Sequence, residues 1–197
     1  MTLAKQGLGW NIRYKMIISI SGVPGSGKTT VAKILAKKLG MNYYYMGGIR
    51  RDMARKNGLT LAQFNKLGEK DPSTDLEVDK YQKELGEKED NFVIQGRTSF
   101  HFIPHSIKIF LNVNLREGAR RIFQDIQENP GERNEPYKSL EETSKEMKKR
   151  IISDKIRYKK YYNFDSYDKK HYDLVIDTTH LPAEKVAHKI MDFVKKK

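Results

Sequence analysis

The fold of this chain is decided by residues 18–33, ISISGVPGSGKTTVAK. The run MIISIS, residues 16–21, is mostly apolar and ends at a glycine, which predicts a buried strand. Beyond Gly27 the apolar residues recur at a helical spacing, so a helix is predicted to begin near Lys28. Between the two elements, residues 22–29 match G-x-x-x-x-G-K-[ST] in the strand-to-helix setting that this pattern requires. The sequence therefore predicts a loop that wraps around phosphate groups.

The residue types in this loop explain how it would hold a phosphate chain. Glycines let successive backbone N–H groups turn toward an anion, and the start of a helix adds the positive end of its dipole. Lys28 is expected to reach the outer phosphates as a catalytic residue, and the Thr29 hydroxyl is expected to ligate Mg²⁺. The predicted nucleotide-binding residues are Gly22, Val23, Pro24, Gly25, Ser26, Gly27, Lys28, Thr29 and Thr30. The loop predicts a bound nucleoside triphosphate, but it leaves open whether the γ-phosphate goes to water, to a protein or to a small molecule.

Composition narrows the class of protein further. The 197 residues are enough for one domain with an ordinary core, and there is no cysteine for disulfides or thiolate metal sites. The five histidines form no metal-ligand pattern. Residues 1–15 lack the apolar core of a signal peptide, and no apolar run reaches the roughly 20 residues of a membrane helix. We expect a cytoplasmic monomer with no membrane segment, in which residues 16–197 form one domain and residues 1–15 are a disordered extension or an interaction arm.

Short apolar runs alternate with helical segments along the rest of the chain. A parallel sheet covered on both faces produces this alternation, because its strands are apolar throughout and each is followed by a helix. We expect strands at residues 16–21, 43–46, 91–95, 107–113 and 172–177. We expect helices at residues 28–39, 48–57, 60–69, 73–88, 115–128, 139–162 and 182–195, with capping by Ser73 and Ser139. The predicted fold class is a three-layer α/β/α domain.

Arginines at strand ends and on two helices indicate a second anion beside the triphosphate. The arginines concerned are Arg51, Arg97, Arg120, Arg121, Arg150 and Arg157. Arg51 and Arg97 follow predicted strands, so they lie at the carboxyl edge where parallel sheets bind ligands. Arg150, Asp154 and Arg157 share one face of a predicted helix because of their i, i+4, i+7 spacing. Phosphoryl transfer between two anions requires their repulsion to be neutralised, and the arginine fork suits phosphate oxygens.

Taken in order, these motifs resemble the short, archaeal-type cytidylate kinases of the nucleoside monophosphate kinase family. The likeness runs from Met16 to the C-terminus and includes GLTLAQFNK and DPSTDLEVD, which resemble that family's short monophosphate-binding insert. It implies a P-loop kinase fold with a five-stranded parallel sheet, a helical monophosphate-binding segment at residues 48–88 and a small lid at about residues 121–157. It also implies ATP as the phosphoryl donor, Mg²⁺ as the metal, and CMP or dCMP as the acceptor.

The resemblance also implies roles for single residues. The implied substrate-binding residues are Arg51, Arg97, Arg150, Asp154 and Arg157, and the implied catalytic arginines are Arg121 and Arg150. Arg51 and Arg97 would bind the α-phosphate of the acceptor. Arg150 and Arg157 would lie near the same phosphate, while Asp154 would contact the ribose. Arg121 would lie against the donor nucleotide.

Five positions depart from the pattern of that family, among them Gly48, where an Asp is common, and Tyr45, where a serine is common. Gln95 stands where a carboxylate usually helps to hold Mg²⁺, and Thr98 stands where bacterial relatives have an acidic residue near the base. Asp125 stands where a lid arginine is common, so Arg133 in the following loop would have to supply that positive charge. A missing lid arginine implies a slow or specialised enzyme, because an arginine of this kind contributes about 10³- to 10⁵-fold to the rate.

Two other functions stay open at this point. One is a kinase of the same fold whose acceptor is AMP, UMP or another small phosphorylatable metabolite. A nucleotide-regulated RNA-binding protein would use the formal charge of +13, from 38 Lys and Arg against 25 Asp and Glu. Much of that excess lies at residues 145–160 and 195–197, where solvated helix faces explain it. We therefore expect small nucleotides, rather than nucleic acid, as partners.

Overall fold

Five parallel strands form the centre of the computed structural model, which describes residues 16–129 and 137–197. In sheet order they are β2 (Asn42–Tyr45), β3 (Phe92–Gln95), β1 (Ile17–Gly22), β4 (Ile107–Asn112) and β5 (Leu174–Asp177). In the register of the central strand, Ile20 lies opposite Gln95 on one side and Ile109 on the other. Because all the strands run the same way, their carboxyl ends meet at one edge of the sheet. The predicted five-stranded parallel sheet is confirmed.

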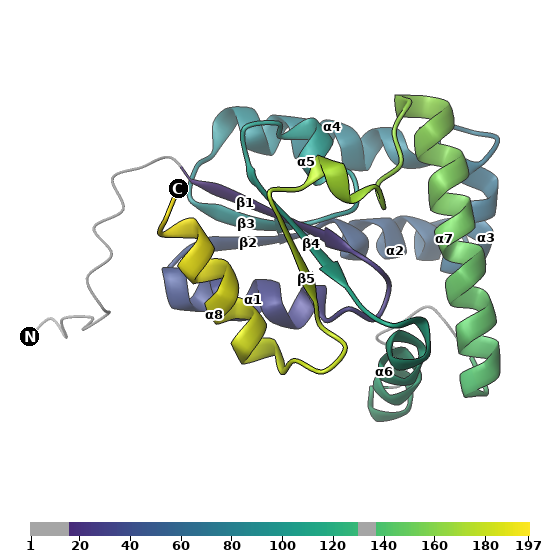
Figure 1. Cartoon of the computed structure of the whole chain (residues 1–197). Coiled ribbons are helices and arrows are strands. Elements are labelled where there is room, and N and C mark those ends of the chain that lie inside the picture. Colours follow the sequence, from purple (N-terminus) through teal and green to yellow (C-terminus); the bar gives the residue numbers. More distant parts are fainter. Residues whose placement is uncertain (1–15, 130–136) are drawn as a thin grey trace, which may run out of the picture.

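Helices cover both faces of this sheet (Figure 1). Helices α1 (Lys28–Leu39) and α8 (Ala183–Val194) lie on one face, and α4 (Ser73–Lys88) and α5 (Ser99–Phe102) lie on the other. One buried cluster joins Ile18 and Ile20 to Leu35 of α1 and Ile190 of α8. A second cluster joins Ile94, Phe92 and Ile17 to Val78 and Leu85 of α4. The three-layer α/β/α architecture is therefore confirmed, with an apolar core on each side of the sheet.

The remaining helices gather at the carboxyl end of the strands (Figure 1). They are α2 (Met46–Lys56), α3 (Leu61–Gly68), α6 (Leu115–Glu128) and α7 (Leu140–Tyr162), with a 3₁₀ turn, η1 (Lys169–His171), before β5. Helix α3 packs against α7, and α7 packs against α6. The predicted helix boundaries agree within two residues. The sequence missed α5 and η1, which are too short to show a helical period.

Capping at the helix starts was predicted only in part. The Ser139 hydroxyl accepts the Glu142 N–H at 3.1 Å, as expected, although the Glu142 carboxylate accepts from the Lys138 N–H instead of that of Ser139. The prediction for Ser73 is wrong, because this residue is already inside α4 and its N–H donates to the Asp71 carboxylate at 2.9 Å. A capping box that the sequence analysis missed opens α3, where Thr60 and Gln63 exchange hydrogen bonds.

The tyrosines at the end of α7 contribute to a buried aromatic cluster. Tyr158 is 5% exposed and stacks on Tyr162 and Phe164. The Tyr161 hydroxyl donates to the Gly68 carbonyl at 2.8 Å and so ties α7 to the end of α3. In composition this run resembles a surface that stacks on RNA bases, but its rings are used to pack the protein.

Some sequence predictions concern residues outside the described part of the chain. The extension 1–15 is one of them, and Arg133, within residues 130–136, is another. In residues 16–129 and 137–197, none of the helices has the length and apolar character needed to cross a membrane.

Candidate active site

A large cavity of about 970 Å³ opens at the carboxyl edge of the sheet. Its walls come from the loop after β1, from the ends of β2 and β3, and from helices α1, α2, α4, α6 and α7. In parallel sheets this edge is where ligands bind, because the loops that follow the strands converge there. The loop after β1 lines this cavity, and so do arginines of α2, of α7 and of the loop after β3.

The loop after β1 has the backbone shape that its glycines predict. Gly25 and Gly27 have φ angles of +76° and +80°, in the left-handed region that favours glycine. A Cβ atom on Gly25 would lie 2.2 Å from the carbonyl oxygen of Gly118 in α6. The loop therefore combines a left-handed backbone with a close approach to a neighbouring helix, and only glycine satisfies both conditions. Gly118 keeps the same contact open from its side, because a Cβ atom there would lie 2.9 Å from the Pro24 carbonyl oxygen.

Lys28 lies across this loop. Its ammonium group donates to the Val23 carbonyl at 2.6 Å and to the Gly22 carbonyl at 3.0 Å. The side chain lines the cavity at the start of α1, where the helix dipole also favours an anion. This is the position from which a lysine reaches the outer phosphates of a nucleotide.

The residues beside Lys28 suit a magnesium ion that is shared with phosphate oxygens. The half-buried Thr29 lines the cavity, and so does Gln95, whose side-chain oxygen accepts from the Tyr43 hydroxyl at 2.9 Å. Both side chains carry a neutral oxygen that would suit Mg²⁺, which readily completes its shell with phosphate oxygens and water. Within the two described ranges, no cluster of three or more His, Asp or Glu side chains is arranged to hold a metal. The chemistry of the site therefore fits Mg²⁺ bound together with a nucleotide.

Two arginines reach the cavity from strand ends, as predicted. Arg51 is 7% exposed; its guanidinium lies over the Tyr45 ring at 5.8 Å and donates to the hydroxyl of the same tyrosine. Arg97 is held from behind by the Asp154 carboxylate at 2.7 Å and by the Tyr167 hydroxyl at 3.1 Å. Arg51 and Arg97 both line the cavity with their positions fixed by neighbouring side chains.

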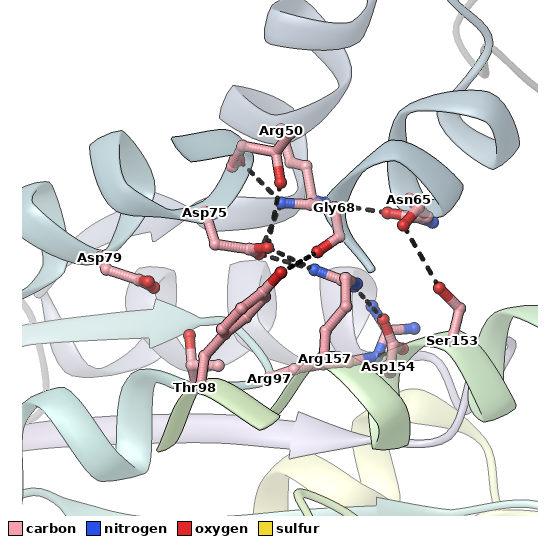
Figure 2. A network of polar contacts seen from close by, with 12 residues as sticks. Arg50, Asn65, Gly68, Asp75, Asp79, Arg97, Thr98, Ser153, Asp154 and Arg157 are labelled. Carbon is pink, nitrogen blue, oxygen red and sulfur yellow. Dashed lines mark hydrogen bonds and ion pairs between the residues drawn. The ribbon is translucent and has the colours of Figure 1, made fainter. Parts of the chain in front are cut away.

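Behind these arginines lies a buried chain of alternating charges (Figure 2). Arg50 and Arg157 each donate to Asp75, at 2.6 Å. Arg157 also donates to Asp154 at 2.6 Å, and Asp154 in turn pairs with Arg97. The elements involved are α2, α4, α7 and the loop after β3, so the network joins four parts of the chain that are distant in sequence.

The electrostatics of this network favour a bound anion. Burial alone would raise the pKa of Asp154, but the adjacent Arg97, Arg157 and Arg150 hold it below its usual value. Burial opposes the charge on Arg97, yet the facing Asp154 outweighs it, so the pKa of Arg97 is raised. Three guanidinium groups share two carboxylates in this described network, which leaves a net positive charge beside the cavity. A phosphate at the mouth of the network would balance it.

At the opposite end of the cavity, Arg121 is fixed to the loop after β5. It donates to the Thr178 carbonyl at 2.8 Å and to the Thr179 carbonyl at 3.0 Å, and it pairs with Glu117 at 2.7 Å. Asp125 lines the same end one turn further along α6. This end adjoins the start of α1, so it is the side on which the nucleotide held by the loop would lie.

Comparison with known proteins agrees with this geometry. The model of the cytidylate kinase-like family matches residues 17–180. The chain belongs to that family. The cytidylate kinase of Methanocella arvoryzae is 40% identical over 92% of this chain and 99% of its own length. The cytidylate kinase of Archaeoglobus fulgidus is 36% identical over 92% of this chain and 96% of its own length.

Solved structures support the fold at lower identity. Shikimate kinase from Bacteroides thetaiotaomicron covers 92% of this chain and 99% of its own length, with a TM-score of 0.62 and 16% identity. Shikimate kinase from Acinetobacter baumannii in complex with shikimate covers 92% and 94%, with a TM-score of 0.56 and 18% identity. At such identities these neighbours establish the P-loop kinase fold alone.

The predicted residues of this family member divide into two groups. Those that line the cavity are Pro24, Gly25, Gly27, Lys28, Thr29, Thr30, Arg51, Arg97, Arg121 and Arg150. Those that lie behind it are Gly22, Val23, Ser26, Asp154 and Arg157. Asp154 is 1% exposed and does not line the cavity, so the expected ribose contact would require its carboxylate to become accessible. In this structure Asp154 and Arg157 hold Arg97 in place.

Sequence reasoning missed three residues of the site. Arg50, Asp75 and Asp79 all line the cavity, and Arg50 rather than Arg51 joins the buried network. The signal for Asp75 and Asp79 was present in the sequence, because their i, i+4 spacing, continued at Gln82, places them on one face of the helix predicted at residues 73–88. Nothing in the sequence distinguishes Arg50 from its neighbour, since both follow the same strand.

Proposed function

We propose that this protein is a nucleoside monophosphate kinase that transfers the γ-phosphoryl group of ATP to CMP or dCMP. The observation that carries the proposal is a single cavity with a phosphate-binding loop at one end and a separate, buttressed group of arginines at the other. An enzyme that hydrolyses a nucleotide needs only the first of these. A second positive site at the same cavity supports a second phosphorylated substrate.

The proposed mechanism asks little covalent chemistry of the protein. Phosphoryl transfer depends mainly on aligning the two substrates and on balancing charge as the phosphoryl group moves. Lys28 is placed to follow the migrating phosphate, because its ammonium group lies over the loop at the start of α1. Thr29 and the nucleotide's phosphate oxygens would together hold Mg²⁺, which supplies further positive charge at the transferred group.

The arginines would then orient the acceptor. Arg51 and Arg97 would bind its phosphate, with Arg150 beside them on α7. Because Arg97 is fixed by Asp154 before the substrate arrives, little side-chain entropy is lost on binding. Arg121 would lie against the donor, held by the loop after β5. Asp154 and Arg157 serve as positioning residues in this scheme.

A panel of monophosphates tests the proposal. CMP, dCMP, UMP, AMP and GMP would be offered with ATP and Mg²⁺, and diphosphate formation would be measured at steady state. The expected result is the highest kcat/KM for CMP or dCMP. The proposal fails if none of these acceptors is phosphorylated by protein that still binds ATP. Light scattering on the same sample tests the expected monomer.

The two alternative functions are not favoured. A kinase with this fold for AMP or UMP would give the same cavity, and the panel separates the cases directly. The RNA-binding alternative depends on surface charge, whereas Arg157, in the basic stretch at residues 145–160, is buried in ion pairs with Asp75 and Asp154.

A further inference from the structure

Asp79 lies in the wall of the cavity and has no part in the mechanism described so far. It projects from α4, is 7% exposed, and lines the cavity together with Val78 and Thr98. Its Oδ2 atom accepts a hydrogen bond from the Tyr162 hydroxyl of α7. Its Oδ1 atom lies 3.5 Å from the side-chain nitrogen of Gln82, so this contact is weak. Figure 2 shows Asp79 to one side of the charged network, on the side where Thr98 lies.

A hydrogen-bonded set of polar groups adjoins this carboxylate through Gln82. The Gln82 side chain is fully buried; its oxygen accepts from Ser99 at 2.6 Å and its nitrogen donates to the Thr98 hydroxyl oxygen at 3.0 Å. Thr98 thus receives a hydrogen bond from behind, and its own hydroxyl proton can be directed into the cavity. A Cβ atom on Gly96 would lie 2.2 Å from the Ser99 hydroxyl oxygen, so only a glycine at this position leaves room for the Ser99 side chain.

We propose that Asp79 and Thr98 together read the base of the acceptor, and that they select a pyrimidine with a 4-amino group. Asp79 would accept a hydrogen bond from the amino group, and Thr98 would donate one to the ring nitrogen N3. The inference rests on the proposed function, because it assumes that the acceptor phosphate lies at Arg51 and Arg97. From there, α4 and the loop after β3 form the next stretch of cavity wall.

The chemistry of the two pyrimidines explains the selection. Cytosine offers a donor at the 4-amino group and an acceptor at N3, whereas uracil offers an acceptor at O4 and a donor at N3. An ionised carboxylate is an acceptor only, so it pairs with the first pattern and repels O4 of the second. Thr98 completes the match, because its oxygen already accepts from Gln82. A buried polar group left without a partner costs affinity for the wrong base.

The charge state of Asp79 sets the pH at which this selection operates. Burial raises the pKa of Asp79 to about 7; the Tyr162 hydroxyl lowers it, the neighbouring Asp75 raises it, and Arg50 and Arg157 lower it. Below that pH a protonated Asp79 can also donate to O4 of uracil. The preference for CMP over UMP should therefore rise as the pH increases through about 7, when kcat/KM is measured.

The central experiment exchanges the carboxylate for an amide. Asp79→Asn keeps the size of the side chain but adds a donor, which can pair with O4 of uracil. At pH 8 we expect the ratio of kcat/KM for CMP to that for UMP to fall about tenfold or more relative to the wild type. Glu77→Gln, on the exposed side of the same helix, is the matched control and should leave the ratio unchanged. An unchanged ratio in folded Asp79→Asn, or equal losses for both bases, would overturn the proposal.

Binding measurements keep this test independent of turnover. Calorimetric titration of the full chain with CMP and with UMP measures base choice even if no phosphoryl transfer is seen. If the wild type binds CMP more tightly than UMP and Asp79→Asn reduces this preference, base reading is supported, even where the kinase proposal has failed for lack of phosphoryl transfer. If the wild type binds CMP and UMP with equal affinity, base reading is overturned. If Asp79→Asn does not fold, Thr98→Val is the second variant. It removes the hydroxyl donor with little change of shape, so it should weaken the binding of CMP while leaving the binding of UMP unchanged. If Thr98→Val binds CMP as tightly as the wild type does, the inference is contradicted.

Discussion

The position of the Lys28 side chain is fixed by the loop that surrounds it. Its ammonium group is held by two carbonyl oxygens of the loop, so it is already in place before a nucleotide binds. We therefore expect the lysine to contribute mainly to charge balance in the transition state, and less to the stability of the folded chain.

Lys28→Ala is expected to lower kcat by about 100-fold or more, which is the typical cost of removing one group that stabilises developing charge. The free energy of unfolding should fall by only about 1 kcal/mol, because each lost hydrogen bond contributes little net stability. Steady-state assays and urea unfolding measure the two effects. Lys37→Ala, exposed on the same helix, is the control, and wild-type activity in Lys28→Ala would refute the assigned role.

Asp79 makes stability depend on pH in an unusual direction. Its pKa of about 7 in the folded chain, raised mainly by burial, lies above the value of about 3.9 expected in the unfolded chain. Between these values the folded state binds more protons, so this group lowers the free energy of unfolding as pH rises from about 4 to about 7. Glu117 titrates below this window, because hydrogen bonding to Arg120 and to Arg121 lowers its pKa to about 2.

We therefore expect the difference in the free energy of unfolding between Asp79→Asn and the wild type to favour the variant more at pH 7.5 than at pH 5. Urea unfolding of both proteins at the two pH values measures the change. The same pH dependence in wild type and variant would show that Asp79 does not carry a proton in this range.

At the scale of elements, α7 connects the two sides of the acceptor site. Asp154 and Arg157, one turn apart on this helix, pair with Arg97 after β3 and with Asp75 on α4. Because ion pairs to Arg97 and to Asp75 hold α7 in place, the helix can present Arg150 to the cavity in one orientation. Through this network, the packing of α7 determines where the arginines of the candidate site lie.

Asp154→Asn should disturb this arrangement without removing a contact to the sugar. We expect kcat/KM to fall by the same factor for CMP and dCMP, because both need a positioned Arg97. A larger loss for CMP would instead indicate a contact with the 2′-hydroxyl group. Breaking a buried ion pair costs about 3–5 kcal/mol, so melting is measured in parallel, with Asp192→Asn, exposed on the distant helix α8, as control.

The start of α3 offers a smaller test of element stability. Thr60 and Gln63 form a capping box there, and α3 packs on α7. Thr60→Ala should lower the free energy of unfolding by about 1 kcal/mol, and Thr60→Ser, which keeps the hydroxyl, should restore most of it. Equal stability of the alanine variant in denaturant unfolding would show that the cap contributes nothing.

At the scale of the whole molecule, the formal charge of +13 attracts anions without selecting among them. Attraction of this kind comes from exposed lysines and is screened by salt within about 10 Å at 0.1 M. The proposed acceptor site is different, because Arg51 is buried and Arg97 is half-buried and paired with Asp154, and salt screens such charges far less. General attraction and specific binding should therefore separate when salt is varied.

We expect binding of single-stranded RNA, measured by fluorescence anisotropy, to fall steeply between 50 and 200 mM salt. Calorimetric CMP affinity should fall much less over the same range. RNA binding that survives 200 mM salt would support the nucleotide-regulated RNA-binding alternative, and CMP binding with the same salt dependence as RNA would argue against a buried acceptor site.

Local patterns were enough to predict the architecture. The alternation of apolar strands and amphipathic helices depends on neighbours in sequence, and it predicted the parallel sheet and the long helices within two residues. The short α5 and η1 were missed because four or three residues show no period. Ser73 was mistaken for a cap, whereas Pro72 occupies the cap position and the Asp71 carboxylate accepts the Ser73 N–H.

The sequence by itself determined the phosphate-binding loop, because its function requires particular residue types at fixed local spacing. Only the tertiary structure decided which arginine joins Asp75, that Asp154 and Arg157 lie behind the cavity, and that Asp79 faces into it. These outcomes depend on contacts between α2, α4, α7 and the end of β3. Ion pairs and burial between segments distant along the chain leave no periodic mark in the sequence, so they become visible only when the chain has folded.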